Sequence, residues 1–169
     1  MGQNKLLVLF FEEPNRLFQI REIARLAKMP KSTAARMLKE LTKERLIARR
    51  KENVVGYIAN ETDSYFRLLK KISFLKTVHQ SGLIDYLSDN FHPECIILFG
   101  SFAKGEYNKG SDIDIFLQSK EKSYDLAKFE KKLKHAVNLF FEENFSNLSN
   151  ELFNNIINGI KLSGYIRLK

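Results

Sequence analysis

The sequence predicts an α+β protein built in two parts, and three patterns along the chain lead to this prediction. Apolar residues recur at helical spacing over residues 20–43, two short strand-like segments follow over 46–60, and two apolar runs typical of buried strands lie over 95–117. With 44% hydrophobic and 28% charged residues among 169, the chain is typical of a globular protein. We expect an N-terminal domain over 1–60, a helical linker over 61–92 and a C-terminal domain over 93–169.

In the N-terminal domain the predicted order is helix, turn, helix and hairpin. The first helix ends before Pro30, because proline disfavours helix in the residue that precedes it. A second helix follows, with Ser32 or a neighbour as its N-cap. Two strand-like segments, 46–50 and 54–60, then flank the polar turn 51–53. The apolar face of the second helix contains Ala34, Met37, Leu38 and Leu41.

This order resembles that of winged helix-turn-helix DNA-binding domains, over roughly residues 5–60. The resemblance implies that DNA is a partner, that the second helix enters the major groove, and that the hairpin lies against the DNA backbone. The residues implied to contact DNA are Lys31, Ser32, Thr33 and Arg36 of the helix and Arg49, Arg50 and Lys51 of the hairpin. Such domains commonly pair on two half-sites, so a homodimer is also expected. The alternative is a winged helix used for protein contact.

The charge distribution favours the DNA-binding alternative. The net charge is +8, and residues 1–60 carry 13 Lys and Arg against 6 Glu, so nearly all of the excess lies in this domain. A basic domain joined to a near-neutral one suggests a polyanionic partner, although a solubilising surface would look the same. The chain has no apolar run of about 18 residues and no secretory signal, and it has one cysteine, Cys95. We therefore expect a cytoplasmic protein with no membrane partner.

The linker is predicted to be helical. Phe66, Leu69, Ile72 and Leu75 recur at helical spacing, and the segment 81–91 is predicted to contain a break and a second short helix. This aromatic-rich face is interpreted as packing between the two domains or as a dimer contact.

Two aspartates stand out in the stretch "LFGSFAKGEYNKGSDIDIFL", residues 98–117. Strands are predicted at 95–99 and 112–117, separated by a Gly100-Ser101 turn, a short helix and a loop. Strand alternation places Asp112 and Asp114 on one face, where two like charges repel each other unless a cation lies between them. Mg²⁺, or Mn²⁺, suits carboxylate ligands and substrate phosphates, and the Gly-Ser turn offers N–H groups and a hydroxyl to a phosphate. The pattern indicates a metal-dependent site for a nucleoside triphosphate.

The same stretch resembles the signature of the minimal branch of DNA polymerase beta-like nucleotidyltransferases, and the resemblance covers about residues 93–169. It implies a small mixed sheet flanked by helices, with catalytic Asp112 and Asp114 holding the metal. It further implies in-line attack on the α-phosphorus of the nucleotide, with pyrophosphate leaving. The implied nucleotide-binding residues are Gly100, Ser101, Gly105 and Ser111. The alternative is an acidic hairpin with a surface aspartate pair.

One position departs from this signature. Members of the family carry a third carboxylate on a following strand, and the corresponding residue here is Asn138, in "AVNLFF". An amide oxygen ligates a metal weakly and cannot accept a proton. Asn138 is therefore expected to be at most a weak metal ligand. Glu142 or Glu143 would lie more than about 13 Å further along the strand. A shifted alignment is the other alternative, but residues 148–166 are expected to continue the family's C-terminal helix in register.

Two functions follow from these residues. The first is a Mg²⁺-dependent nucleotidyltransferase that moves NMP, AMP above all, onto an unidentified acceptor. Because the minimal branch resembles antitoxins that act on a HEPN-type RNase, a protein acceptor of this kind is a candidate partner. The second is a transcription regulator whose domain binds nucleotide or a partner without turnover. Asn138 favours the second function, whereas the Gly-Ser and Asp-x-Asp residues favour Mg²⁺-nucleotide binding under both.

Overall fold

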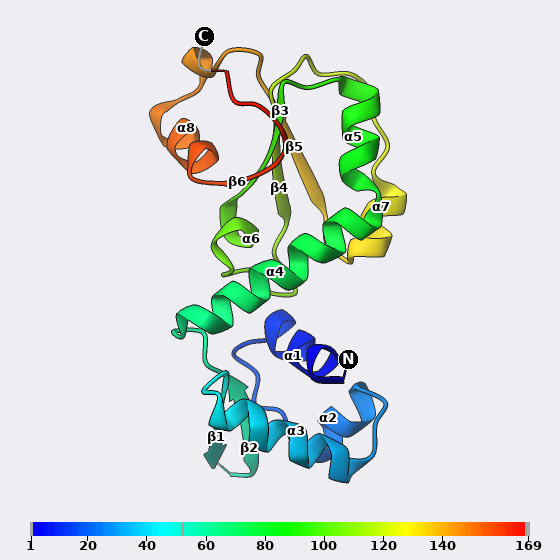
Figure 1. Cartoon of the computed structure of the whole chain (residues 1–169), viewed down its shortest axis with the longest axis vertical. Helices are drawn as coiled ribbons and strands as arrows, with labels where there is room; N and C mark the ends of the chain where they lie inside the picture. The colour runs from blue at the N-terminus through cyan, green and yellow to red at the C-terminus, as the bar shows by residue number, and fades with distance from the viewer. Residues whose placement is uncertain (1, 52, 168–169) are drawn as a thin grey trace. The chain divides into compact units, whose positions relative to one another are not determined.

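The computed structural model describes residues 2–51 and 53–167, and the chain divides into two compact units, Met1–Lys70 and Lys71–Lys169. The long helix α4 (Ser64–Ser81) crosses this division (Figure 1). Among the described residues, no helix has both the length and the apolar character that crossing a membrane requires.

The N-terminal unit begins with a helix that the sequence patterns above did not identify, α1 (Gly2–Glu12). Its apolar residues form one buried face of the unit's core. The ring of Phe10 makes an edge contact with Phe18 at 5.3 Å, and the ring of Phe11 makes one with Phe66 at 5.2 Å. Helix α1 therefore supplies part of the core on which the following elements pack. The buried residues of this face are Leu6, Leu7, Phe10 and Phe11.

Helices α2 (Ile20–Leu26) and α3 (Lys31–Lys43) form the predicted helix-turn-helix. The predicted apolar face of α3 is buried, and it consists of Ala34, Met37, Leu38 and Leu41. The prediction of Ser32 as N-cap is wrong, because Pro30 occupies the N-cap position and makes no side-chain cap. Ser32 consequently lies inside the first turn of α3, with its side chain exposed.

A two-stranded antiparallel hairpin completes this unit, formed by β1 (Ile47–Lys51) and β2 (Val55–Ala59). Phe18 extends it by one bridge, because its backbone N–H and C=O both bond to Tyr57 at 2.9 Å. Gly56 allows the approach of Leu17, whose Cγ would lie 2.6 Å from an added Cβ. Glu52, in the predicted turn, lies outside the described residues.

The C-terminal unit is built on a mixed four-stranded sheet with the order β5-β4-β3-β6 (Figure 1). β4 pairs with β3 antiparallel and with β5 parallel, and α7 (Ala127–Leu133) lies between β4 and β5 in the chain. The helices α5 (Leu83–Phe91) and α6 (Gly100–Lys104) flank β3 in sequence. The strands are β3 (Cys95–Phe99), β4 (Ile113–Leu117), β5 (Val137–Phe141) and β6 (Ile160–Gly164).

The expectation of a continuous C-terminal helix is wrong in its second half. A 3₁₀ turn (Phe145–Asn147) leads to α8 (Asn150–Ile157), and the chain then forms β6, which pairs antiparallel with β3. Gly159 makes this change of direction possible, because a Cβ there would lie 2.4 Å from the carbonyl oxygen of Leu98. Only a residue without a side chain lets α8 end so close to β3.

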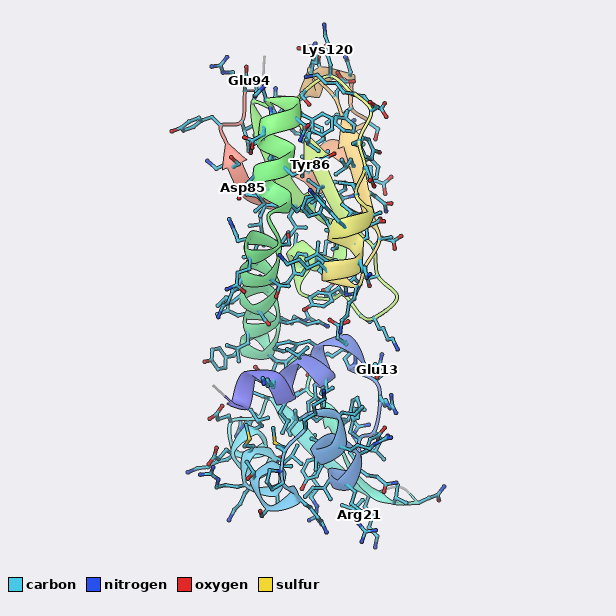
Figure 2. All side chains as sticks on the ribbon, turned by 90° about the vertical axis from the view of Figure 1, so that its right-hand side faces the viewer. Glu13, Arg21, Asp85, Tyr86, Glu94 and Lys120 are labelled. Carbon is cyan, nitrogen blue, oxygen red and sulfur yellow. The ribbon has the colours of Figure 1, made fainter. Side chains whose placement is uncertain are left out.

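The two faces of the sheet are covered by different helices. α5 and α7 lie on one face and α8 on the other (Figure 1). On the α8 face, Phe116 of β4 packs with Phe145 and Ile156, and Asp114 shares this face because it stands two residues before Phe116. Glu94, just before β3, and Lys120, just after β4, lie together at one end of the unit (Figure 2). Asp112, just before β4, and Asp114, its second residue, therefore lie toward the opposite end.

Candidate functional site

Gly100 and Asp114 are in direct contact at the end of β3. Phe99 pairs in register with Asp114, so the Gly-Ser turn that follows β3 lies beside the Asp114 carboxylate. A Cβ at position 100 would stand 2.4 Å from Asp114 Oδ2, and Gly100 has a φ of +69°, a conformation that favours glycine. Both observations require glycine here, and they bring the two halves of the predicted site together.

Asn138 lies directly beside Asp114. The two residues are register partners in the parallel pair β4/β5, and Asn138 Nδ2 donates a hydrogen bond of 3.2 Å to Asp114 Oδ1. The opposite amide orientation would set two acceptor oxygens against each other, so the observed one is favoured. The amide therefore faces the carboxylate as a donor. At this position the site has no group that can accept a proton.

The other predicted nucleotide-binding residues lie on the segment between β3 and β4. Ser101 is half-buried in the first turn of α6, and Gly105 ends that helix with a φ of +74°. The hydroxyl of Ser111 accepts a 2.9 Å hydrogen bond from the backbone N–H of Asn108, which closes the loop before the aspartates. Asp112 is exposed immediately before β4, whereas Asp114 is half-buried within it. Gly105 and Ser111 thus shape the segment that joins the turn to the aspartates.

An aromatic cluster that the sequence patterns did not reveal supports this segment. The rings of Phe102 and Tyr107 stack at 4.1 Å, and His135 meets Phe102 edge-on at 5.0 Å. His135 Nδ1 also lies 2.8 Å from the carbonyl oxygen of Ser111. All three side chains are buried, so the loop that carries the aspartates rests on packed rings. Residues so far apart in the sequence give no pattern that would predict this cluster.

Glu142 does not replace the missing third carboxylate. It lies at the end of β5 remote from Asn138, where its Oε1 accepts hydrogen bonds from the Asn144 backbone N–H at 3.0 Å and from Asn147 Nδ2 at 2.9 Å. The bond from Asn144 is the main reason that the pKa of the Glu142 carboxyl is lowered from its ordinary value. Glu142 therefore organises the turn after β5.

Replacement of Glu142 by glutamine tests this assignment. Glu142→Gln should leave nucleotide binding unchanged and lower the free energy of unfolding at pH 7 by only about 0.5 kcal/mol, because the bonds are exposed. A lowered pKa in the folded state means that the contribution exists above the ordinary carboxyl pKa and is lost as the pH falls through the folded value. Urea unfolding over a series of pH values from 7 downward measures this: the difference in stability between the two proteins should shrink as the pH falls below the ordinary carboxyl pKa. A large loss of nucleotide binding would show that Glu142 belongs to the site.

The donor set fits a divalent cation that prefers oxygen. Two carboxylates one residue apart, beside a turn with no side chain at position 100, are the kind of ligands that Mg²⁺ takes together with substrate phosphates. Across residues 2–51 and 53–167, no three His, Cys, Asp or Glu side chains gather into a metal site. The pair Asp112 and Asp114, with the Asn138 amide as neighbour, is thus an oxygen-rich site with two charges.

A hollow of about 510 Å³ lies on another part of the C-terminal unit. It is lined by residues of α5 and α7, among them Tyr86, Lys128 and Lys132. Tyr86 is on α5 (Figure 2), and its ring packs on Phe129 of α7 at 5.0 Å. This hollow is on the face of the sheet opposite Asp114. The hollow is therefore separate from the predicted phosphate-binding residues.

The predicted DNA-contacting side chains lie on two elements of the N-terminal unit. Lys31, Ser32 and Arg36 are exposed on α3, and Thr33 is half-buried there. Arg49, Arg50 and Lys51 are exposed along β1. Strand alternation puts Arg49 and Lys51 on one face of β1 and Arg50 on the other. The structure thus places the predicted side chains on a helix and a hairpin strand of the same compact unit.

Comparison with known families agrees with both units. Residues 5–51 match the IclR helix-turn-helix domain, and residues 81–164 match the polymerase beta, nucleotidyltransferase family. The chain joins an IclR-type helix-turn-helix domain to a polymerase beta nucleotidyltransferase domain. No curated protein shows significant sequence similarity to it. The matches confirm the predicted families and the α+β fold with its wing, and the nucleotidyltransferase match includes β3 to β6 and both aspartates.

The contribution of the hairpin to DNA binding can be measured in this helix-turn-helix domain. Replacing Arg49, Arg50 and Lys51 with alanine should weaken binding to duplex DNA at least about tenfold and lower the slope of log K against log salt by about 2 to 3, if each contacts a phosphate. Fluorescence anisotropy at several salt concentrations gives both quantities. The matched control replaces Lys120, Lys122 and Lys131, exposed lysines of the nucleotidyltransferase domain, for the same charge change. Equal effects of the two triple variants would show that net charge alone attracts DNA.

Proposed function

We propose that this protein is a DNA-binding regulator whose nucleotidyltransferase domain binds a nucleoside triphosphate with Mg²⁺ but does not turn it over efficiently. The observation that carries the proposal is the position of Asn138 beside Asp114, with its amide donating to Asp114 Oδ1 at 3.2 Å. A residue at that position would have to take a proton from the attacking hydroxyl, and a primary amide cannot do so.

In this proposal each retained residue has a binding role. Asp112 and Asp114 hold the divalent cation, and the hydroxyl and backbone N–H of Ser101 bind phosphate oxygens. Gly100 leaves room for a phosphate to approach the Asp114 carboxylate, since a Cβ there would meet Asp114 Oδ2 at 2.4 Å. A bound Mg²⁺ neutralises triphosphate charge and, in an active enzyme, stabilises the leaving pyrophosphate. Asn138 fixes the orientation of Asp114 through its hydrogen bond.

A second candidate function is transfer of an NMP unit, AMP above all, to an acceptor such as a HEPN-type RNase partner. The contact between Gly100 and Asp114 favours it, because it retains the geometry of a site that holds a triphosphate. In this case one of the two aspartates would have to take the proton of the acceptor, because the Asn138 amide cannot.

Labelled ATP distinguishes the two functions. The native chain, incubated with Mg²⁺ and α-labelled ATP, with itself and with candidate partner proteins as acceptors, should bind the nucleotide and release no pyrophosphate above the uncatalysed rate. Label incorporation by the native chain that disappears in Asp112→Ala would establish the transferase and refute the regulator proposal. DNA binding is measured separately with the helix-turn-helix variants above.

A further inference from the structure

Phe140 is an exposed aromatic residue on the same face of the sheet as the aspartates. It stands two residues after Asn138 in β5, so both side chains point to one face, and it pairs in register with Phe116, two residues after Asp114. Its exposed fraction is 37%, whereas Phe116 is fully buried. β5 is an edge strand of the sheet, so Phe140 has a neighbouring strand on one side only.

Phe140 is also held in place by the strand that leads to the Gly-Ser turn. Its ring meets the ring of Phe99 at 5.2 Å between centroids, with an angle of 68° between the planes. Phe99 is the residue before Gly100 and is only 6% exposed. The buried Phe99 thus supports one side of the Phe140 ring, while part of the Phe140 surface remains open to solvent.

We infer that Phe140 is the stacking platform for the base of the bound nucleotide. Two residues along a strand span about 6.6 Å, so Phe140 lies roughly that far along the strand from Asn138 and its register partner Asp114. A ribose spans a comparable distance between the α-phosphate and the base. Every nucleobase presents a π-face, and stacking on an aromatic side chain stabilises it without hydrogen-bond readout. The chemistry of the site therefore points to a nucleoside triphosphate, with preference for purines, whose larger rings overlap more with Phe140.

This inference rests on the proposed nucleotide site and adds the part of the ligand that the aspartates do not contact. Stacking predicts that Phe140 affects only ligands with a base. Inorganic tripolyphosphate provides the comparison, because it carries the phosphates of ATP and lacks both ribose and base.

Calorimetric titration of the full chain with ATP and with tripolyphosphate, both in Mg²⁺, tests the inference. Phe140→Ala should weaken ATP binding about tenfold and leave tripolyphosphate binding unchanged. Phe140→Leu, which keeps an apolar contact with Phe99, should also weaken ATP binding, and Phe140→Tyr should preserve it. The matched control is Tyr165→Ala, an aromatic residue that is 79% exposed and follows β6 beside Glu94, at the opposite end of the sheet. This control should bind both ligands as the native chain does.

Three results would overturn the inference. Equal weakening of ATP and tripolyphosphate in Phe140→Ala would show that Phe140 only supports the phosphate site through Phe99. Unchanged ATP binding in Phe140→Ala and Phe140→Leu would show that the base lies elsewhere. In both cases the proposed phosphate site would stand. If the native chain binds neither tripolyphosphate nor ATP, the proposed function itself is refuted, and the role of Phe140 as a stacking platform with it.

Discussion

Replacement of Gly100 by alanine is expected to weaken binding of Mg²⁺-ATP by about 100-fold, because the added Cβ displaces the Asp114 carboxylate. The Cβ would stand 2.4 Å from Asp114 Oδ2, which is closer than the two atoms can approach. The positive φ of +69° adds a backbone strain of roughly 1–2 kcal/mol. Isothermal titration calorimetry measures the affinity, and thermal unfolding measures the strain.

Gly82→Ala separates these two effects. Gly82 also has a positive φ, +82°, but a Cβ there would have no neighbour within 4 Å. It precedes α5, apart from the aspartates, and should show a similar backbone strain with no change in nucleotide affinity. If Gly82→Ala and Gly100→Ala reduce nucleotide affinity equally, the loss comes from general destabilisation, and the contact between Gly100 and Asp114 has no role in binding.

Restoring a carboxylate at position 138 is expected to raise NMP transfer by about 10²- to 10⁴-fold, the usual contribution of a positioned general base. Asn138→Asp keeps the size of the side chain. It replaces the amide Nδ2, which donates to Asp114 Oδ1 at 3.2 Å, with a carboxylate oxygen that can accept a proton. Formation of labelled AMP, with water as acceptor, or of labelled protein, with an added protein as acceptor, measures the rate of transfer from α-labelled ATP.

The same substitution has a consequence for stability that needs no acceptor. A third carboxylate beside Asp114 replaces a hydrogen bond with like-charge repulsion, so Asn138→Asp should have a lower Tm without divalent cations. Mg²⁺ should raise its Tm more than that of the native chain. Asn138→Ala, which removes the hydrogen bond and adds no charge, controls for the loss of the bond. No gain in transfer, with the Mg²⁺ effect present, would show that Asn138 is not what limits turnover.

The parts of the fold with strong local patterns were predictable from the sequence. The apolar run Cys95–Phe99 is the observed β3. In the second run, where the observed strand β4 begins at Ile113, the alternation of side chains predicted that Asp114 faces the opposite side of the sheet from Ile113 and Ile115. The prediction that Asn138 occupies the position of the third carboxylate depended on the resemblance of its segment, "AVNLFF", to the corresponding strand of the family. The register of β4 with β5 now places it opposite Asp114.

Elements whose identity depends on distant partners were harder to predict. β6 follows α8 directly, and it becomes a strand because β3 offers it an unpaired edge, which no local pattern reveals. The approach of Gly159 to the Leu98 carbonyl and the ring contacts of His135 also join residues far apart in the chain. α1, in contrast, had a readable signal in the helical spacing of Leu6, Leu7, Phe10 and Phe11.

The central claim is that the Asp114 carboxylate and its neighbours bind the phosphates of a nucleotide through a divalent cation. Titration calorimetry of ATP into the native chain and into Asp114→Asn, each with Mg²⁺ and with EDTA, tests it directly. The native chain should bind ATP only when Mg²⁺ is present, and Asp114→Asn, which keeps the shape and loses the charge, should bind at least about 30-fold more weakly. Equal affinity with Mg²⁺ and with EDTA, or equal affinity of the two proteins, would contradict the claim.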